Sequence, residues 1–147
     1  MPEISLDIDV KAPIEAVWRA VVEVERYPAS MVNVRSVEVI AEESEGVRVS
    51  AWAIVLKGAI LEWTERDHLD EEAHVVSFSQ VSGDLERFDG AWHLERRGER
   101  LTNVSLEISF EIGIPLLAEM LDPVAERSLR ENCTEMLLGV EHEAIRS

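Results

Sequence analysis

Two acidic residues on one predicted strand are the main candidates for chemistry in this sequence. Glu65 and Asp67 lie two residues apart in a predicted strand over 59–69, so strand alternation places both on the same face as Trp63. A carboxyl group in apolar surroundings holds its proton more tightly, and a second carboxylate beside it strengthens that effect. One carboxyl would then act as general acid and the other as general base. The alternative is that both face solvent or pair with an arginine: Arg48, Arg66 or Arg87.

Asn132 interrupts an apolar face of the predicted C-terminal helix and is the third catalytic candidate. Its amide would either bind a ligand carbonyl or tie the helix to a strand backbone, as most buried polar groups do. Trp63, Phe88 and Trp92 have flat apolar rings that suit a cyclic ligand, but such rings also serve as plain core. Both alternatives stay open for these residues. Trp52 is ambiguous, because its strand has apolar residues on both faces.

The other reactive side chains indicate no metal site and no cofactor. The histidines, which show no i, i+4 pairing, are His68, His74, His93 and His142. The single cysteine, Cys133, excludes an internal disulfide and a cysteine-based zinc site, and we predict it as a small core residue. The glycines are too scattered to form a phosphate-binding loop.

Length and charge narrow the class of protein further. The 147 residues fit one domain over 1–147, and the 46% hydrophobic content is ordinary for a globular protein. The formal charge of −16 disfavours nucleic acid and anionic membrane surfaces, which present phosphates. No apolar run approaches the length of a bilayer span, and the N-terminal residues do not resemble a signal peptide. We therefore expect a cytoplasmic monomer or homodimer without integral membrane association.

Hydropathy periods predict one strand, one or two short helices, six strands and a long helix. The strands are predicted over 4–10, 36–43, 47–56, 59–69, 73–81, 85–96 and 101–112. A helix is predicted over 13–24, a short irregular or helical piece follows Tyr27-Pro28 to Val34, and a final helix covers 115–145 with a kink or restart at Asp122-Pro123. The breaks between the six strands carry glycine or clustered charge, which is typical of tight hairpin turns. Such short spacing requires antiparallel pairing.

These elements predict an internal cavity, because a single helix covers the apolar face of a curved seven-stranded sheet only partly. The last strand should face the helix with Val104, Leu106, Ile108, Phe110 and Ile112. The residues predicted to line the cavity and bind a ligand are Trp63, Phe88, Trp92, Leu106, Ile108, Val124, Ser128 and Asn132.

Three segments carry a family resemblance. They are residues 10–18 (VKAPIEAVW), residues 83–94 (GDLERFDGAWHL) and the helix around Asn132. Their order resembles the START/birch-pollen-allergen (SRPBCC) superfamily, in its polyketide cyclase/dehydrase and coenzyme Q-binding branch. The resemblance implies an α+β helix-grip fold, with a seven-stranded antiparallel sheet curved around a long C-terminal helix. It also implies that Leu61, Trp63, Glu65 and Asp67 face the cavity.

Aromatase/cyclase members of this superfamily carry polar residues that this sequence has mostly replaced. Glu65 and Asp67 stand where those members have serine and arginine, Val34 replaces a tyrosine and Val124 a histidine, while Asn132 is kept. The resemblance therefore favours a protein that binds a hydrophobic small molecule, namely a lipid, quinone or polyketide. The alternative is a polyketide cyclase, aromatase or dehydratase acting on a poly-β-keto substrate. A ribosome-associating role, also known in the superfamily, is disfavoured by the charge.

Overall fold

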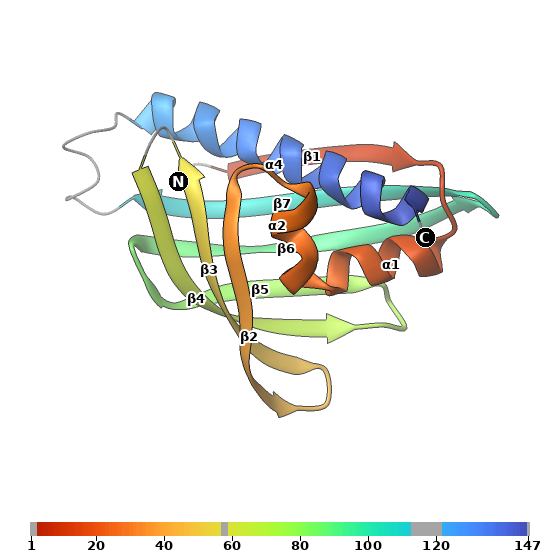
Figure 1. Cartoon of the computed structure of the whole chain (residues 1–147), viewed down its shortest axis with the longest axis horizontal. Coiled ribbons are helices and arrows are strands. Elements are labelled where there is room, and N and C mark those ends of the chain that lie inside the picture. Colours follow the sequence, from red (N-terminus) through yellow and green to blue (C-terminus); the bar gives the residue numbers. More distant parts are fainter. Residues whose placement is uncertain (1–2, 57–58, 113–121, 147) are drawn as a thin grey trace.

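Seven antiparallel strands form one sheet that curves around a long C-terminal helix (Figure 1). The computed structural model describes residues 3–56, 59–112 and 122–146, without the side chains of 59, 112 and 122–126. The strand order is β1-β7-β6-β5-β4-β3-β2, so β1 and β2 are the edges. The strands are β1 Glu3–Val10, β2 Val34–Ser44, β3 Val47–Leu56, β4 Ala59–Asp70, β5 Val75–Gly83, β6 Leu85–Gly98 and β7 Leu101–Ile112. The predicted fold class is confirmed.

Short helices connect β1 to β2 and pack beside the C-terminal helix. They are α1 Ile14–Val22, a 3-10 turn over Val24–Arg26, and α2 Tyr27–Ser30. Helix α1 follows Pro13, whose missing N–H costs nothing at a helix start, and it buries Ile14, Val17 and Val21 on one side. It ends at Val22, two residues before its predicted end.

The C-terminal helix α4 covers Asp122–Arg146 and lies across the concave side of the sheet (Figure 1). The predicted stretch from 115 to 121 lies outside the described residues. The buried apolar side chains of α4 recur at helical spacing: Leu129, Cys133, Leu137, Val140 and Ala144. None of the helices in the described ranges is both long and apolar enough to cross a membrane.

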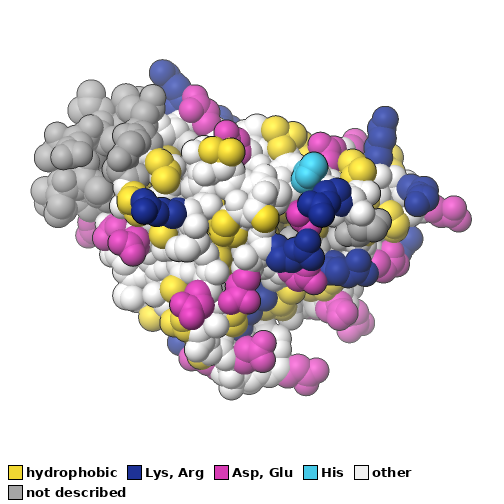
Figure 2. Space-filling view, in the orientation of Figure 1, with side chains coloured by type: hydrophobic (Ala, Val, Ile, Leu, Met, Phe, Trp, Pro, Cys, Tyr) yellow, Lys and Arg dark blue, Asp and Glu magenta, His cyan; other side chains and the backbone are white. Residues whose placement is uncertain are grey.

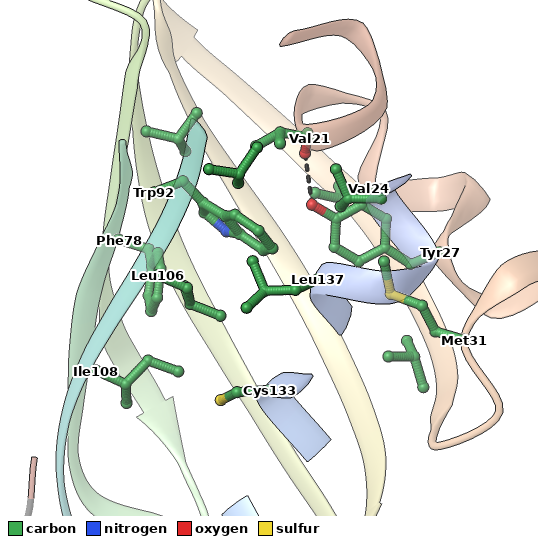
Figure 3. Packing of buried hydrophobic residues seen from close by; sticks show 14 of the residues in the cluster. Val21, Val24, Tyr27, Met31, Phe78, Trp92, Leu106, Ile108, Cys133 and Leu137 are labelled. Carbon is green, nitrogen blue, oxygen red and sulfur yellow. Dashed lines mark hydrogen bonds between the residues drawn. The ribbon is translucent and has the colours of Figure 1, made fainter. Parts of the chain in front are cut away.

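The inner face of β7 supplies much of the floor of the core. Val104, Leu106, Ile108 and Phe110 are all buried, as the period-two pattern predicts. The side chain of Ile112 lies outside the described residues. Figure 3 shows Leu106 and Ile108 pointing toward Cys133 and the helix side of the core. Alternation along β7 therefore fixes which side chains meet α4.

On the face shown in Figure 2, acidic side chains are spread out rather than gathered in one patch. The arginines on the visible face lie among acidic neighbours, and Arg26 pairs with both Glu23 and Glu143. Arg146 also contacts Glu143, at 3.5 Å. The basic side chains in this region are therefore largely neutralised locally.

We expect Gly90→Ala to destabilise the protein, because the glycine sits where two neighbours approach its backbone. A Cβ atom at Gly90 would lie 2.1 Å from the Glu107 carbonyl oxygen and 2.9 Å from the Phe78 ring. Relieving that overlap should cost about 1–3 kcal/mol in the free energy of unfolding. Gly98→Ala on the same strand is the matched control, since its Cβ would meet only Leu101 at 3.7 Å. Equal midpoints of chemical denaturation for the two variants would contradict this prediction.

Candidate functional site

A cavity lies between the inner face of the sheet and α4. Five aromatic residues form most of the sheet side, and Leu129, Asn132, Cys133 and Met136 of α4 close the helix side. The complete described lining is Trp52, Ile54, Trp63, Glu65, Phe78, Phe88, Trp92, Leu106, Ile108, Leu129, Asn132, Cys133 and Met136. The wall is therefore apolar with very few polar groups, a composition typical of small-molecule sites.

Six of the eight predicted ligand-binding residues line this cavity: Trp63, Phe88, Trp92, Leu106, Ile108 and Asn132. Ser128 is buried, but it is not part of the described wall, and its hydroxyl has no hydrogen-bond partner among the described residues. The side chain of Val124 lies outside the described residues. Whether these side chains bind a ligand stays a prediction.

The cavity is smaller than the sequence led us to expect. Its volume is about 30 Å³, which holds about two water molecules. Typical small-molecule sites enclose about 300–1,000 Å³. The reason is the size of the side chains on the concave face, where five aromatic rings meet the leucine and methionine of α4. A ligand larger than water must displace some of these side chains.

Four aromatic side chains of the wall, Trp52, Trp63, Phe88 and Phe78, contact one another in that order. Trp52 and Trp63 stack with ring centroids 5.8 Å apart and an interplanar angle of 4°. Phe88 packs on Trp63 at 4.9 Å, and Tyr27 meets Trp52 edge to face at 5.5 Å. Because Trp52 and Trp63 are directly opposite each other on β3 and β4, the strand register brings the two indoles together.

Three pairs of facing residues on β3 and β4 combine polar side chains with two of these indole rings. Arg48 opposes Asp67, Ser50 opposes Glu65, and Trp52 opposes Trp63. We call these six residues the β3–β4 polar ladder. Facing positions on antiparallel strands lie on one side of the sheet, so all six side chains point inward.

Asp67 is the charged centre of the polar ladder. Its Oδ2 atom accepts hydrogen bonds from Arg48 Nε at 3.2 Å and from Ser50 Oγ at 2.8 Å. Ser50 Oγ in turn accepts from the indole nitrogen of Trp52 at 2.9 Å. The Oδ1 atom of Asp67 is buried and has no hydrogen-bond partner in the described part of the chain. The carboxylate is thus paired on one oxygen only.

Glu65 is the carboxylic acid residue of the described cavity wall. Its Oε1 atom accepts a hydrogen bond from the Trp63 indole nitrogen at 2.8 Å, and its side chain is buried. Burial, followed by the adjacent Asp67, raises the pKa of Glu65 well above its ordinary value. A proton on Glu65 is also the donor that the unpartnered Asp67 oxygen lacks. Glu65 therefore holds its proton more tightly than an exposed glutamate does, and Asp67 is the carboxyl group that faces Arg48.

The alternative that both carboxylates face solvent is wrong, since Glu65 is 4% and Asp67 1% exposed. The alternative of an arginine partner holds for Asp67, and the partner is Arg48. Arg66 instead pairs with Glu43 at the surface, and Arg87 contacts Asp89. Asp67 does not itself belong to the described cavity wall. Asp67 would therefore affect a bound molecule through Glu65 or through the electrostatic field of its own carboxyl group.

Asn132 combines both of the roles considered for it. It lines the cavity, and its Nδ2 atom also donates to the Val55 carbonyl oxygen at 3.3 Å. The hydrogen bond ties α4 to β3 and fixes the direction of the amide. Among the described residues the Asn132 side chain makes this one hydrogen bond, although an amide can make up to four.

Sequence reasoning missed Tyr27 and Ser50 among the residues that shape the site, named Arg48 as one of three possible arginine partners, and left Trp52 ambiguous. The Tyr27 hydroxyl donates to the Val21 carbonyl oxygen at 2.6 Å (Figure 3), and burial raises its pKa. A signal for Arg48 and Ser50 was available, because both alternate with Trp52 on one predicted strand. That strand is apolar on both faces, so its inward side was not evident.

The described residues offer no cluster of three or more histidine, cysteine or acidic side chains that would hold a metal ion. His68 and His93 are exposed on the strands, and His74 packs edge-on against Trp18 at 5.5 Å. Cys133 is buried in the cavity wall, and desolvation raises its pKa to about 12. A thiol with so high a pKa is a weak nucleophile at neutral pH.

Comparisons with known proteins agree with this architecture. A family model described as polyketide cyclase/dehydrase and lipid transport matches residues 10–137. The structure is similar to that of TTHA0849 from Thermus thermophilus, with 29% sequence identity, a TM-score of 0.91, and coverage of 99% of this chain and 98% of that one. No curated protein has a significantly similar sequence.

Two further solved structures, both below 25% identity, share the fold. The Zhui aromatase/cyclase from Streptomyces sp. R1128 has 23% identity and a TM-score of 0.86, over 99% of this chain and 94% of that one. A START superfamily protein from Mycobacterium smegmatis has 14% identity and a TM-score of 0.84, over 98% and 97% of the two chains.

Proposed function

The chain belongs to the polyketide cyclase/dehydrase and lipid-transport family, and from this premise we propose that it binds a hydrophobic small molecule in the cavity between the sheet and α4. A lipid, a quinone or a polyketide would each suit such a site. The observation that carries the proposal is the wall itself, in which five aromatic rings surround one carboxyl group and one amide. This combination of apolar surface with a few placed polar groups is typical of ligand pockets.

A ligand would have to enlarge the cavity by moving side chains. Met136 is the most adaptable residue of the wall, because its unbranched side chain has three rotatable bonds and it is only partly buried. Leu129 and Phe88 are buried and more constrained. We therefore expect binding to shift α4 side chains while the sheet register is kept.

Cys133→Leu is expected to weaken binding of a neutral hydrophobic fluorophore by about tenfold, because the added carbon atoms occupy the cavity. Val140→Leu is the matched control, since Val140 is buried on the same helix but does not belong to the described wall. Fluorescence titration of both variants and the wild type measures the effect. Equal loss in the two variants would place the binding site elsewhere.

A second function is favoured by the position of Glu65 and Asp67. A polyketide cyclase or dehydratase needs a base to remove an acidic proton between two carbonyls and an acid to help expel water. We propose that Glu65 would exchange the proton with the substrate, that Asn132 would bind a substrate carbonyl, and that Asp67 would act on Glu65 without touching the substrate. The resulting step is aldol closure followed by loss of water.

Glu65→Gln is expected to lower such turnover by at least about 100-fold, because glutamine cannot exchange a proton. Fluorophore affinity should stay within a few-fold, since the amide keeps the shape and the hydrogen bond from Trp63. The assay follows cyclised product from a short poly-β-keto substrate by mass spectrometry. If the wild type forms no product while it still binds the fluorophore, the protein is a binding module only.

A further inference from the structure

The β3–β4 polar ladder reaches two separate hollows of the molecule. At one end, Glu65 lines the cavity between the sheet and α4. At the other end, Arg48 lines a surface cleft of about 650 Å³ between the 3-10 turn and β2. Ser50 and Asp67, which are almost completely buried, belong to neither lining. The ladder therefore provides a line of polar side chains from the cavity to the surface of the protein.

Direct contacts link three residues of this line. Burial, followed by a hydrogen bond with Asp67, raises the pKa of Glu65, and Asp67 Oδ2 accepts a hydrogen bond from Arg48 Nε at 3.2 Å. Two buried atoms of the line, Asp67 Oδ1 and Arg48 Nη2, have no hydrogen-bond partner among the described residues. Leaving such atoms unpaired costs free energy. A free acceptor on Asp67 and a free donor on Arg48 suit a proton and a water molecule that pass between Glu65 and the cleft.

The charges of the cleft favour this passage. Glu42 faces Arg48 across the β2–β3 pairing and is exposed in the cleft, so it offers Arg48 a second carboxylate. The other charged residues of the cleft are Glu23, Glu25 and Arg26. Three glutamates against two arginines leave the cleft acidic, and an acidic cleft raises the local concentration of positive ions such as hydronium.

The cavity offers Glu65 no comparable exit for its proton. It holds about two water molecules, which a hydrophobic ligand would displace. The ionisable groups that other elements place on this side are Cys133 of α4 and Tyr27 of α2, which packs on Trp52. Burial raises the pKa of Cys133 to about 12 and raises that of Tyr27, so both keep their protons at neutral pH. The proton of Glu65 would therefore leave on the side of Asp67.

We propose that the polar ladder is a proton relay, by which Glu65 exchanges its proton with water in the cleft while a ligand fills the cavity. Glu65 gives its proton to Asp67 Oδ1, and Asp67 gives it to a water molecule that enters as Arg48 turns toward Glu42. The hydronium ion leaves through the cleft, and the reverse steps restore Glu65. Arg48 keeps its own proton throughout. This inference rests on the second proposed function, in which Glu65 exchanges a proton with the substrate, but its test needs no substrate.

Infrared spectroscopy of the protein in heavy water tests the cavity side of the relay. The carbonyl stretch of protonated Glu65 is identified as the band that Glu65→Gln loses, and it moves to lower frequency when deuterium replaces the proton. The protein is transferred at mildly acidic pH, and the rate of this shift is followed. Saturation of the cavity with the neutral fluorophore phenylnaphthylamine should leave the rate unchanged. A rate that falls about tenfold or more on binding would show exchange through the cavity and overturn the relay.

A chemical block tests the cleft side. Ala41 is exposed and lines the cleft, so N-phenylmaleimide attached to Ala41→Cys should fill it and slow the exchange by about tenfold or more. Cys133 is buried with a raised pKa and should not react. Labelled Ala29→Cys is the matched control, because Ala29 is exposed in a different cleft, between α2 and α4, and its label should have no effect. Backbone amide exchange of the same samples should stay unchanged.

The possible results separate the inference from the proposed function. Equal rates before and after labelling of Ala41→Cys overturn the relay, and so does an equal loss in labelled Ala29→Cys. If Glu65→Gln loses no carbonyl band, Glu65 carries no proton and the inference is wrong. Should the label unfold Ala41→Cys, Glu42→Cys carries it in the same cleft and decides. If phenylnaphthylamine does not bind the wild type, the proposed binding function fails, while the labelled variants still decide the relay.

Discussion

Replacing Arg48 with leucine is expected to lower the free energy of unfolding by about 3–5 kcal/mol. Arg48 is the charged partner of Asp67, which is 1% exposed, and only Ser50 would remain to stabilise the carboxylate. A buried charge that loses its counter-charge keeps its full desolvation cost. Denaturant titration of the wild type and the variant at neutral pH measures the difference.

The double variant Arg48→Leu/Asp67→Leu tests whether the stability lost in Arg48→Leu is due to the unpaired charge of Asp67. It removes both charges together, and replacing a buried ion pair by apolar side chains is often neutral or stabilising. Most of the stability lost in the single variant should therefore return. Arg66→Leu is the surface control, because the Arg66–Glu43 pair is exposed to solvent and should contribute little to stability. A double variant as unstable as the single one would show that Arg48 acts through packing rather than charge.

The second large effect concerns the pH dependence of stability in Glu65→Gln. The pKa of Glu65 in the folded protein is raised well above its ordinary value of 4.5, chiefly by burial. The folded state therefore holds this proton more tightly than the unfolded state does. Its contribution to stability is complete below about pH 4.5 and is lost as the pH rises toward the folded-state pKa.

Relative to the wild type, Glu65→Gln should therefore gain stability as the pH rises above 4.5. The gain approaches about 1.4 kcal/mol per pH unit, until the folded-state pKa is passed. The free energies of unfolding of both proteins, measured from mildly acidic to mildly alkaline pH, give the slope directly. Parallel curves for the two proteins would show that Glu65 is not the buried proton carrier.

Glu43→Gln is the control with the opposite sign. Arg66 lowers the pKa of Glu43, so this carboxylate contributes stability above its ordinary value, and the contribution is lost as the pH falls. Any difference between this variant and the wild type should therefore shrink in acid. A neutral-to-alkaline slope like that of Glu65→Gln would contradict the assignment.

The sequence by itself determined the element order and most of the inward faces. Alternation along β7 identified Leu106 and Ile108 as inward, and the turn residues between strands required antiparallel neighbours. It also grouped Trp63, Glu65 and Asp67 on one side of β4. These features depend on residues that are close together in the chain. A hydropathy period of two residues for a strand, or 3.6 residues for a helix, is therefore sufficient to predict them.

Strand register decided which arginine pairs with Asp67. Three arginines were plausible from the sequence, and only the β3–β4 pairing places Arg48 opposite Asp67 and Ser50 opposite Glu65. The same register stacks Trp52 on Trp63. The strand that contains Trp52 is apolar on both faces, so its hydropathy showed no clear period. Register here joins residues that are 11 to 19 positions apart in the chain. Alternation within one strand contains no information about such pairing.

Only the tertiary structure decided the size of the cavity and the burial of its carboxyl groups. Volume depends on how side chains from several strands and α4 pack together, and here they leave about 30 Å³. The pKa of Glu65 depends on the same packing, since water is excluded from its side chain by residues distant in sequence. Charge and periodicity are local properties of the chain, whereas desolvation belongs to the whole fold.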